Sequence, residues 1–506
     1  MKIINILNII KLFYITFRIK FKYKFKKNKK IVLFPSEARL GDILSAFPLY
    51  LSIYKAGYKI EIYMPIGSLG LIPLYLIIGV TRFRFILTFR LNKLNFIDYK
   101  NVFDFRKYIE ASLVRSNRAD SFKLIENREN ELTKLELKIS NLLNNFSKIN
   151  FKNIHAVFFT DYLYIPQGPM MDYLNKYCKD VRLFTYYVGH LSDTLVINKI
   201  DSLNNIRHAY APPFEVFYED LHALDSKSEK KIILGTRETL FKYYEDKEWF
   251  NWVGTTSYIN SKDTKKDSLR PLKNIKDNKY FGIFPHIYWD PSLHVAEGIF
   301  DDFKEWFEIT LDYILRNTNA NIIVKDHPCN LYKLTSIGLE YSSPVKDFID
   351  TFPDHFKERV IYLPPDTEYT TLEIIQMVNF VLTVRGTVGV EACLLGKEVI
   401  FAGTGRFSGY KFGLFPQNKE EYFSLIQKAI KHELKDNKNS LYAANYLNIL
   451  WNKMTFKPEI TKTKYYYYKN NMKLHKKIST FNINFIDKKI SKLSQWFLKP
   501  SSTFLN

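Results

Sequence analysis

Cysteine is scarce in this chain of 506 residues, which contains only Cys178, Cys329 and Cys393. Three scattered cysteines are too few for a disulfide framework, and their spacing matches no zinc site. This scarcity favours a reducing, cytoplasmic setting.

Long uncharged apolar runs are also lacking at the start of the chain. Residues 1–19 read MKIINILNIIKLFYITFRI, and Lys11 and Arg18 interrupt the apolar run. The run is therefore too short and too charged for a transmembrane helix, and no small-residue cleavage site follows it as in a signal peptide. Residues 20–30 interleave lysine with Phe and Tyr. We expect residues 1–30 to form a basic amphipathic segment that lies in the plane of a membrane; a simple basic tail is the alternative.

Two motifs with known chemistry are missing. The loop that follows the first predicted strand, residues 36–42, lacks the GxGxxG pattern, so a dinucleotide cofactor is not supported. No DxD triplet stands in a context suited to a metal ion. We therefore expect no metal and no cofactor.

Acidic residues are absent from residues 1–30, which hold ten Lys and Arg. Residues 453–506 hold twelve Lys and Arg against Glu459 and Asp487. The net charge of the chain is +22 and each end carries +10, which leaves +2 for residues 31–452. A nearly neutral body argues against a nucleic-acid partner. Two basic, aromatic ends predict instead an anionic membrane surface as a partner and a peripheral position on the inner face of the cell membrane.

The most informative stretch that is present is Phe380–Gly409. It reads as a buried strand, a tight turn with Thr387, a helix that ends at Gly396, and a second buried strand. Such a βαβ unit presents backbone N–H groups at the N-terminus of its helix, where an anion is favoured. Thr387 could cap the helix or donate to a phosphate, and Glu391 could accept from a ribose hydroxyl pair. A capped core unit with a solvated Glu391 is the alternative.

The same alternation of strands and helices recurs along the chain and predicts an α/β fold of two Rossmann-like domains that face each other across a cleft. The expected units are a membrane-associating segment (1–30), an N-terminal acceptor domain (31–261), a linker (262–277), a C-terminal nucleotide-sugar domain (278–450) and a basic tail (451–506). Strands are expected in the first half at Lys30–Pro35, Tyr58–Met64, Phe83–Thr88, Asn101–Phe105, Ala156–Phe159 and Leu183–Val188.

Five predicted strands of the second half each end in a loop with polar residues. In a parallel sheet these ends lie on one edge, so their side chains are expected to converge on one crevice. The converging residues are His286, Asp290, His327, Asp366, Thr367, Arg385, Thr387 and Arg406.

These motifs carry a family resemblance. The order FPHIYWD, a helix, KDHP, PPDT and VRGTVGVEACLLGKEVIFAGTGRFSG, over about residues 280–415, resembles bacterial capsule and surface-polysaccharide glycosyltransferases of the GT-B type, a group that includes Kdo transferases. The resemblance implies that His327 and the Gly386–Gly389 turn hold the phosphate of the donor and that Glu391 meets its ribose. It also implies that Asp366, Thr367 and Arg385 line the donor pocket. Lys325 and Arg406 complete the candidate donor-binding set, and the KDHP motif departs from expectation by placing Asp326 where a small or basic residue is usual.

The implied activity is transfer of a sugar from a nucleotide-activated donor, with a CMP-sugar among the candidates, to a growing capsule, lipopolysaccharide or other lipid-linked surface glycan. A catalytic base must lie within hydrogen-bond reach of the acceptor hydroxyl. The candidate bases are Asp42, Glu37 and Asp161 in the first half and His286 across the cleft. Two alternatives remain open, namely a teichoic-acid-type polymer phosphotransferase that uses CDP-alcohols and a non-catalytic scaffold for polysaccharide assembly.

Overall fold

The structure is a computed structural model of the whole chain. It describes residues 14, 17, 31–35, 40–65, 76, 83–86, 97–160, 162–188, 194–200, 211–246, 280–289, 298–327, 330, 343–365, 367, 369–403, 406–431, 434, 438–457, 461–468, 471–478 and 483–500. Most of the predicted membrane-associating segment, and the whole predicted linker, lie outside these residues.

The N-terminal half is built on a six-stranded sheet of order β3-β2-β1-β4-β5-β6. Its strands are β1 (Ile31–Pro35), β2 (Lys59–Pro65), β3 (Phe83–Ile86), β4 (Ile154–Phe159), β5 (Arg182–Val188) and β6 (Leu195–Ile200). All neighbours pair in parallel except β5 and β6, which are antiparallel. This is the strand order of a Rossmann fold, with the order reversing between β1 and β4.

Helices cover both faces of this sheet. On one face lies α2 (Leu40–Lys55), whose apolar side chains share a core with β1, β2, β4 and β5. On the other face lie α4 (Arg106–Asn117), α5 (Arg128–Phe146) and α6 (Gln167–Tyr177). The strand predicted at 101–105 is wrong. Asp98 accepts a hydrogen bond from the backbone N–H of Lys100 and so caps a short 3₁₀ turn, η3 (Tyr99–Asn101), after which the chain enters α4.

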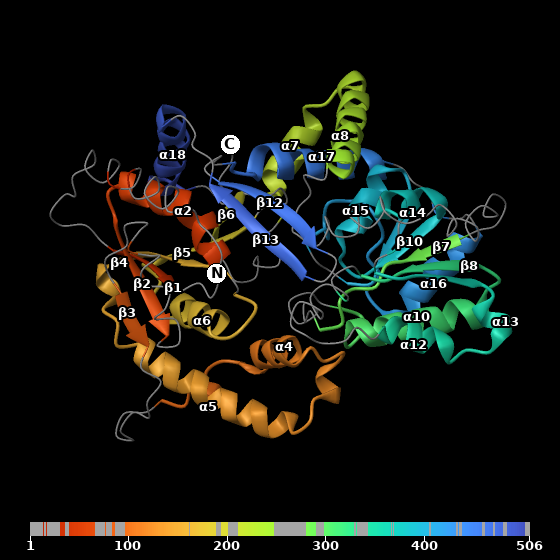
Figure 1. Cartoon of the computed structure of the whole chain (residues 1–506), viewed down its shortest axis with the longest axis horizontal. Coiled ribbons are helices and arrows are strands. Elements are labelled where there is room, and N and C mark those ends of the chain that lie inside the picture. The colour runs from red at the N-terminus through yellow and green to blue at the C-terminus, as the bar shows by residue number, and fades with distance from the viewer. Residues whose placement is uncertain are drawn as a thin grey trace.

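The C-terminal half repeats the design with a five-stranded, wholly parallel sheet of order β11-β10-β7-β8-β9. Its strands are β7 (Tyr280–Ile283), β8 (Asn321–Lys325), β9 (Val360–Leu363), β10 (Phe380–Thr383) and β11 (Glu398–Phe401). The first strand of the half is again central, and the order reverses between β7 and β10. The predicted α/β fold of two Rossmann-like domains is therefore confirmed, and the two halves lie side by side in Figure 1.

Two helical layers sandwich this second sheet. One contains α10 (Phe303–Asn317), α12 (Pro344–Asp350), α13 (Asp354–Lys357) and α16 (Lys419–Ile430). The other contains α14 (Thr371–Met377), α15 (Thr387–Leu394) and α17 (Asn439–Asn448), followed by the π-helical turn η10 (Ile449–Met454).

Two helices before the predicted linker also pack on the second half. These are α7 (Phe214–His222) and α8 (Ser226–Asp246), which the sequence-based boundary at residue 261 assigns to the first half. Phe217 and Leu240 are fully buried in the core that α15 and α17 share. Arg237 donates to the carbonyl of Leu394 at 2.8 Å and closes the C-terminal end of α15.

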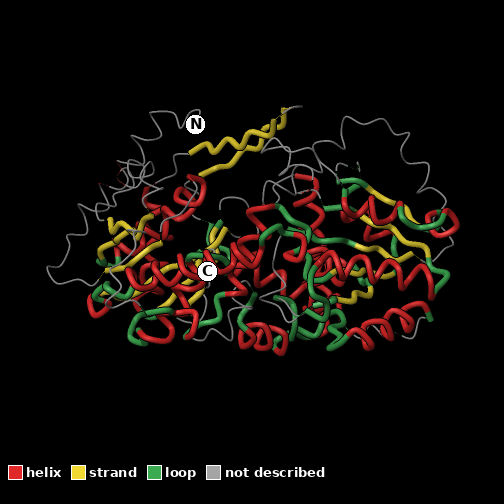
Figure 2. Tube along the Cα trace, turned by 90° about the horizontal axis from the view of Figure 1, so that it is seen from below, coloured by secondary structure: helices red, strands yellow, loops and turns green. Residues whose placement is uncertain are grey.

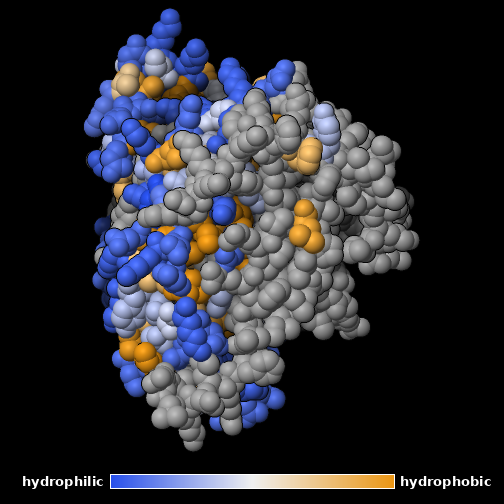
Figure 3. Space-filling view, turned by 90° about the vertical axis from the view of Figure 1, so that its left-hand side faces the viewer, coloured by the Kyte–Doolittle hydropathy of each residue, from blue (hydrophilic) through white to orange (hydrophobic). Residues whose placement is uncertain are grey.

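The last part of the chain returns to the N-terminal half. After the antiparallel ribbon of β12 (Thr461–Tyr468) and β13 (Asn471–Ile478), which projects from the body in Figure 2, comes α18 (Ile483–Leu498). The apolar side of α18 is buried against α2, and Lys55 Nζ lies 2.5 Å from Asp487 Oδ1. The opposite side carries the exposed Lys488 and Lys492. Hydrophilic side chains predominate at the top of the face drawn in Figure 3. Within the described residues, no helix combines the length and apolarity that a membrane crossing requires.

Candidate functional site

The candidate site lies where the strand order of the second sheet reverses. Parallel α/β sheets bind ligands at such a switch point, outside the carboxyl ends of the strands. The loop after β7 carries His286, and the loop after β10 carries Arg385, Gly386 and Thr387. The backbone N–H of Arg385 donates to His286 Nε2 at 3.1 Å, so the two loops are joined across the switch point.

His286 is held in one protonation state by this contact. A neutral imidazole has one donor and one acceptor nitrogen, so acceptance at Nε2 places the hydrogen on Nδ1. Burial lowers the pKa of His286 well below its ordinary value, and the positive charges of Arg385, His327 and Arg406 lower it further. The ring stacks on Phe303, with 4.4 Å between centroids. His286 is therefore a neutral hydrogen-bond donor, which fits contact with an oxygen of a phosphate better than the role of catalytic base predicted as one option.

The N-terminus of α15 opens onto the same place. Gly386 is the N-cap residue, and no side chain caps this end of the helix. Thr387 is the first helical residue, so the capping role considered for it from the sequence is wrong. An uncapped helix N-terminus beside a donor imidazole provides the backbone N–H groups and the dipole that bind an anion.

Gly389, predicted to contact the donor, lies in the first turn of α15 and faces β11. A Cβ atom at this position would lie 2.3 and 2.4 Å from two ring carbons of Phe401. The Phe401 ring is itself buried and stacks on Phe415, with 4.6 Å between centroids. The glycine therefore allows the helix to approach the sheet, which brings the N-terminus of α15 close to the β7 loop.

Replacing Gly389 by alanine should lower the free energy of unfolding by about 2–3 kcal/mol, because the added methyl group overpacks a rigid contact. Chemical denaturation of the purified variant would measure the loss. The matched control is Gly235→Ala on α8, where nothing lies within 4 Å of the added atom. That change should stabilise the helix by up to about 1 kcal/mol. Equal effects of the two substitutions would contradict the packing role.

Asp326, the unexpected residue of the KDHP motif, accepts hydrogen bonds that hold the loop after β8 in place. It is fully buried, and its Oδ1 accepts from the backbone N–H of His327 at 2.6 Å and from Asn330 Nδ2 at 2.8 Å. Its Oδ2 accepts from Ser343 Oγ at 2.8 Å and from the Tyr362 hydroxyl at 3.0 Å. These four bonds fix the loop that presents His327 to the site.

Two other predicted donor-binding residues lie beside this loop. Lys325 ends β8, is buried, and donates to the carbonyl of Asp326 at 2.7 Å and to that of Pro364 at 3.4 Å. Thr367 is buried after β9, and its backbone N–H donates to the Pro364 carbonyl at 3.1 Å. Lys325 therefore ties the end of β8 to the loop after β9, and Thr367 closes a turn within that loop.

Glu391 lies one turn into α15 and is buried, with 3% of its surface exposed. Its Oε2 accepts from the Tyr244 hydroxyl of α8 at 2.9 Å. Burial raises the pKa of Glu391 to about 7, although the bond from Tyr244 and the charge of Arg406 favour the ionised form. The solvated Glu391 of the alternative interpretation is therefore wrong. The positive charge of Arg406 lowers the pKa of both Glu391 and His286.

Several predicted residues are not placed. Glu37, Asp161, Asp290 and Asp366 lie outside the described residues. Asp42 is the third residue of α2, and only its backbone is described. The three N-terminal candidate bases therefore stay predictions. Of the described residues, no group of three or more His, Cys, Asp or Glu could hold a metal ion.

The halves also meet beside His286. Val114 and the loop residues Ile287 and Trp289 form a small shared core. The Arg118 guanidinium lies 4.3 Å from the Trp289 ring centroid, and Lys123 Nζ lies 2.6 Å from Asp301 Oδ2.

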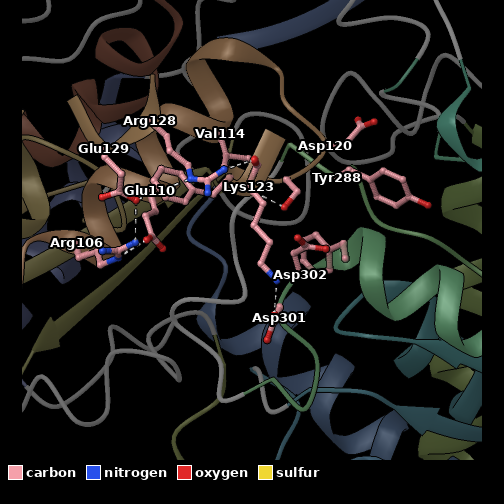
Figure 4. Close-up of a pocket in the computed structure, with 13 residues that line it drawn as sticks. Arg106, Glu110, Val114, Asp120, Lys123, Arg128, Glu129, Tyr288, Asp301 and Asp302 are labelled. Atoms are coloured by element: carbon pink, nitrogen blue, oxygen red, sulfur yellow. Dashed lines mark hydrogen bonds and ion pairs between the residues drawn. The ribbon is translucent and has the colours of Figure 1, made fainter. Parts of the chain in front are cut away.

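A pocket of about 420 Å³ opens at this junction (Figure 4). Its walls are α4, η4 (Phe122–Leu124) and the start of α5 on one side, and the β7 loop and the start of α10 on the other. The lining residues are Arg106, Glu110, Val114, Asp120, Ser121, Phe122, Lys123, Arg128, Glu129, Tyr288, Asp301, Asp302 and Phe303. Phe303 both lines this pocket and stacks on His286, so the pocket and the switch-point site share a wall.

Asp120 in this pocket is a candidate that the sequence analysis missed. It lies between α4 and η4, in a stretch without strand periodicity, and no local motif marks it. Burial raises the pKa of Asp120 above its usual range.

The fold and the site together define an α/β protein of two Rossmann-like domains, with an uncapped helix N-terminus suited to an anion at the switch point of the second. Residues 236–452 match the family model described as capsule polysaccharide biosynthesis protein. The resemblance predicted from the loop motifs is thereby confirmed for this part of the chain, which extends from α8 to η10.

No curated protein matches the sequence. Among solved structures, the chain is similar to the β-Kdo 2,4 transferase of Thermosulfurimonas dismutans KpsC at 13% identity, over 67% of this chain and 88% of that one, with a TM-score of 0.37. It is also similar to Anabaena Alr3699/HepE, solved in complex with UDP, at 11% identity over 83% of this chain and 94% of that one, with a TM-score of 0.30. Likenesses this remote do not carry chemistry from one protein to another.

Proposed function

We propose that this protein is a glycosyltransferase of the GT-B type that moves a sugar from a nucleotide-activated donor to a surface glycan. The observation that carries the proposal is the junction of His286 with the Arg385 backbone at the switch point, next to the uncapped N-terminus of α15. The match to capsule polysaccharide biosynthesis proteins supports the same role.

In this proposal the donor phosphates bind between the β7 and β10 loops. Backbone N–H groups at the start of α15, the His286 imidazole and the Arg385 and Arg406 guanidinium groups would hold them. These donors are also suited to the leaving group, because negative charge develops on the phosphate oxygen as the bond to the sugar breaks. Catalysis of this kind needs no metal ion. His327, held by Asp326, would donate to a phosphate oxygen. Glu391 is buried and accepts from Tyr244, so the contact with the ribose that the family resemblance implies is not part of this proposal.

The acceptor would be a lipid-linked glycan, and the protein would work at the inner face of the cell membrane. The exposed lysines of α18 and the basic composition of both ends of the chain support a contact with anionic lipids.

A nucleotide panel tests the donor site. We expect one nucleotide among CMP, CDP, UDP and GDP, or its sugar conjugate, to stabilise the full-length protein selectively. A ligand at 100 times its dissociation constant adds about 2.7 kcal/mol, which a thermal-shift measurement detects easily. The shift should be lost in His327→Ala and kept in His355→Ala, which removes an exposed histidine of α13 in the same half.

Absence of a shift with every nucleotide would contradict the proposal. A shift retained in His327→Ala would move the donor site away from the switch point. Once a donor is known, the linkage in the product separates the two enzyme classes, since a phosphodiester would indicate a teichoic-acid-type phosphotransferase and a glycosidic bond the function proposed here.

A further inference from the structure

The pocket between the halves is built differently from the donor site beside it. It contains three basic side chains and five carboxylates, whereas the guanidinium groups of Arg385 and Arg406 give the switch point positive charge. Several of its charged groups are already paired, including Arg106 Nε with Glu110 Oε1 at 2.5 Å and Arg106 Nη2 with Glu129 Oε1 at 3.7 Å. An anionic ligand would meet an excess of carboxylates here, so the pocket disfavours phosphates and sugar acids.

A neutral, polyhydroxylated ligand suits these walls. Paired charged side chains offer fixed donors and acceptors to hydroxyl groups, and Phe122, Tyr288 and Phe303 supply aromatic surface. The volume of about 420 Å³ lies within the range of small-molecule sites. The Lys123–Asp301 ion pair joins the two walls, so a ligand in this pocket would touch both halves at once (Figure 4).

We propose that this pocket binds the uncharged sugar at the end of the acceptor glycan, and that Asp120 removes the proton from its attacking hydroxyl. This inference rests on the proposed function. The shared Phe303 wall places an acceptor in the pocket next to a donor held at His286.

The acceptor hydroxyl oxygen forms a bond to the anomeric carbon of the donor sugar, and its proton passes to the Asp120 carboxylate. The bond between the anomeric carbon and the phosphate oxygen breaks, and its electron pair stays on the nucleotide.

The surroundings of Asp120 suit a base. Burial raises its pKa above the ordinary value of an aspartate, which makes the carboxylate more basic. On α10, Lys304 lowers the pKa and Glu308 raises it; Asp302 at the start of that helix and Asp347 on α12 also raise it. The acid limb of the pH–rate profile should therefore lie above the usual titration range of aspartate.

The test uses the full-length protein, the nucleotide sugar found in the thermal-shift panel, and methyl glycosides of glucose, galactose and N-acetylglucosamine as acceptors. We expect transfer to at least one of them and none to glycosides of sugar acids. Asp120→Asn should lower kcat at least 100-fold, with the acceptor KM within threefold and the nucleotide Kd unchanged. The acid limb should disappear in this variant, and its melting temperature should not fall, since the amide removes a buried charge.

A second variant separates binding from chemistry. Glu129→Gln, on the far wall, should raise the acceptor KM about tenfold and leave kcat within threefold, because it removes an acceptor of hydroxyl bonds without touching the base. Asp312→Asn on the outer side of α10 is the control and should behave as wild type, because Asp312 is a surface residue that pairs with Arg316.

Three results would overturn the inference. The first is an Asp120→Asn enzyme that keeps more than a tenth of the kcat or keeps the acid limb. The second is transfer only to anionic glycosides. The third is a sugar covalently attached to Asp120, which would make the carboxylate a nucleophile. A wild-type protein that binds no nucleotide would overturn the proposed function as well, whereas normal nucleotide binding with any of the three would overturn only the assignment of the pocket.

Discussion

Replacing Asp326 by alanine should lower the free energy of unfolding by about 3–5 kcal/mol, because four hydrogen bonds to one buried carboxylate are lost together. Two of its donors, the His327 backbone N–H and the Asn330 amide, would be left without this acceptor. Chemical denaturation would measure the loss. The affinity for the nucleotide should also fall, even at temperatures where the variant is folded, because the loop that carries His327 is no longer held by Asp326.

Two substitutions bracket this prediction. Asp326→Asn should lower the free energy of unfolding by about half as much. The amide keeps one acceptor oxygen, and its NH₂ group can donate to the hydroxyls of Ser343 and Tyr362, which can rotate to accept. Asp312→Ala loses only a surface pair with Arg316 and should cost less than about 0.5 kcal/mol. A loss below 1 kcal/mol in Asp326→Ala would mean that the carboxylate does not organise the loop.

Glu391→Gln should stabilise the protein at alkaline pH by up to about 3 kcal/mol and have little effect at pH 5. The pKa of Glu391 is raised from 4.5 to about 7 in the folded chain. The folded state therefore binds a proton more tightly than the unfolded state, so the contribution of this group is most favourable below pH 4.5. That contribution is lost as the pH rises through the folded pKa of about 7. Glutamine keeps an acceptor for the Tyr244 hydroxyl but does not titrate.

Denaturation of wild type and variant at pH 5, 6, 7 and 8 would check this result. The difference between them is expected to grow with pH and to be below about 1 kcal/mol at pH 5. Glu420→Gln, an exposed glutamate at the start of α16, should show no such growth. A difference that is constant with pH would mean that Glu391 is solvated in the folded protein.

The regular part of the fold follows from local pattern. The apolar runs at 280–285, 321–324 and 380–384 match β7, β8 and β10, and the amphipathic stretch at 419–431 matches α16. The carboxyl ends of parallel strands share one edge of the sheet. The pattern of strands therefore predicts that His286 and Arg385 lie in one site.

The interactions that sequence could not give are those made between distant segments. Tyr244 and Glu391 are 147 residues apart, and Ser343 reaches Asp326 across a stretch without clear periodicity. The role of Asp120 depends on α10, which approaches it from the other half, so no pattern around residue 120 could reveal it. Helices α7 and α8 were assigned to the first half by chain order, but their apolar sides fit α17 in the second.

The packing of α18 on α2 has a consequence for synthesis of the chain on the ribosome. Lys55 and Asp487 form an ion pair although 432 residues separate them. At roughly 10 residues per second, about 40 seconds pass between the emergence of α2 and that of the helix that covers it. During this time the apolar side of α2 lacks its native cover, which makes the nascent N-terminal half a client for chaperones that bind exposed apolar surface. The first domain to emerge is therefore the last to be completed, and a premature stop codon between η10 and α18 would leave both halves synthesised but the first of them unfinished.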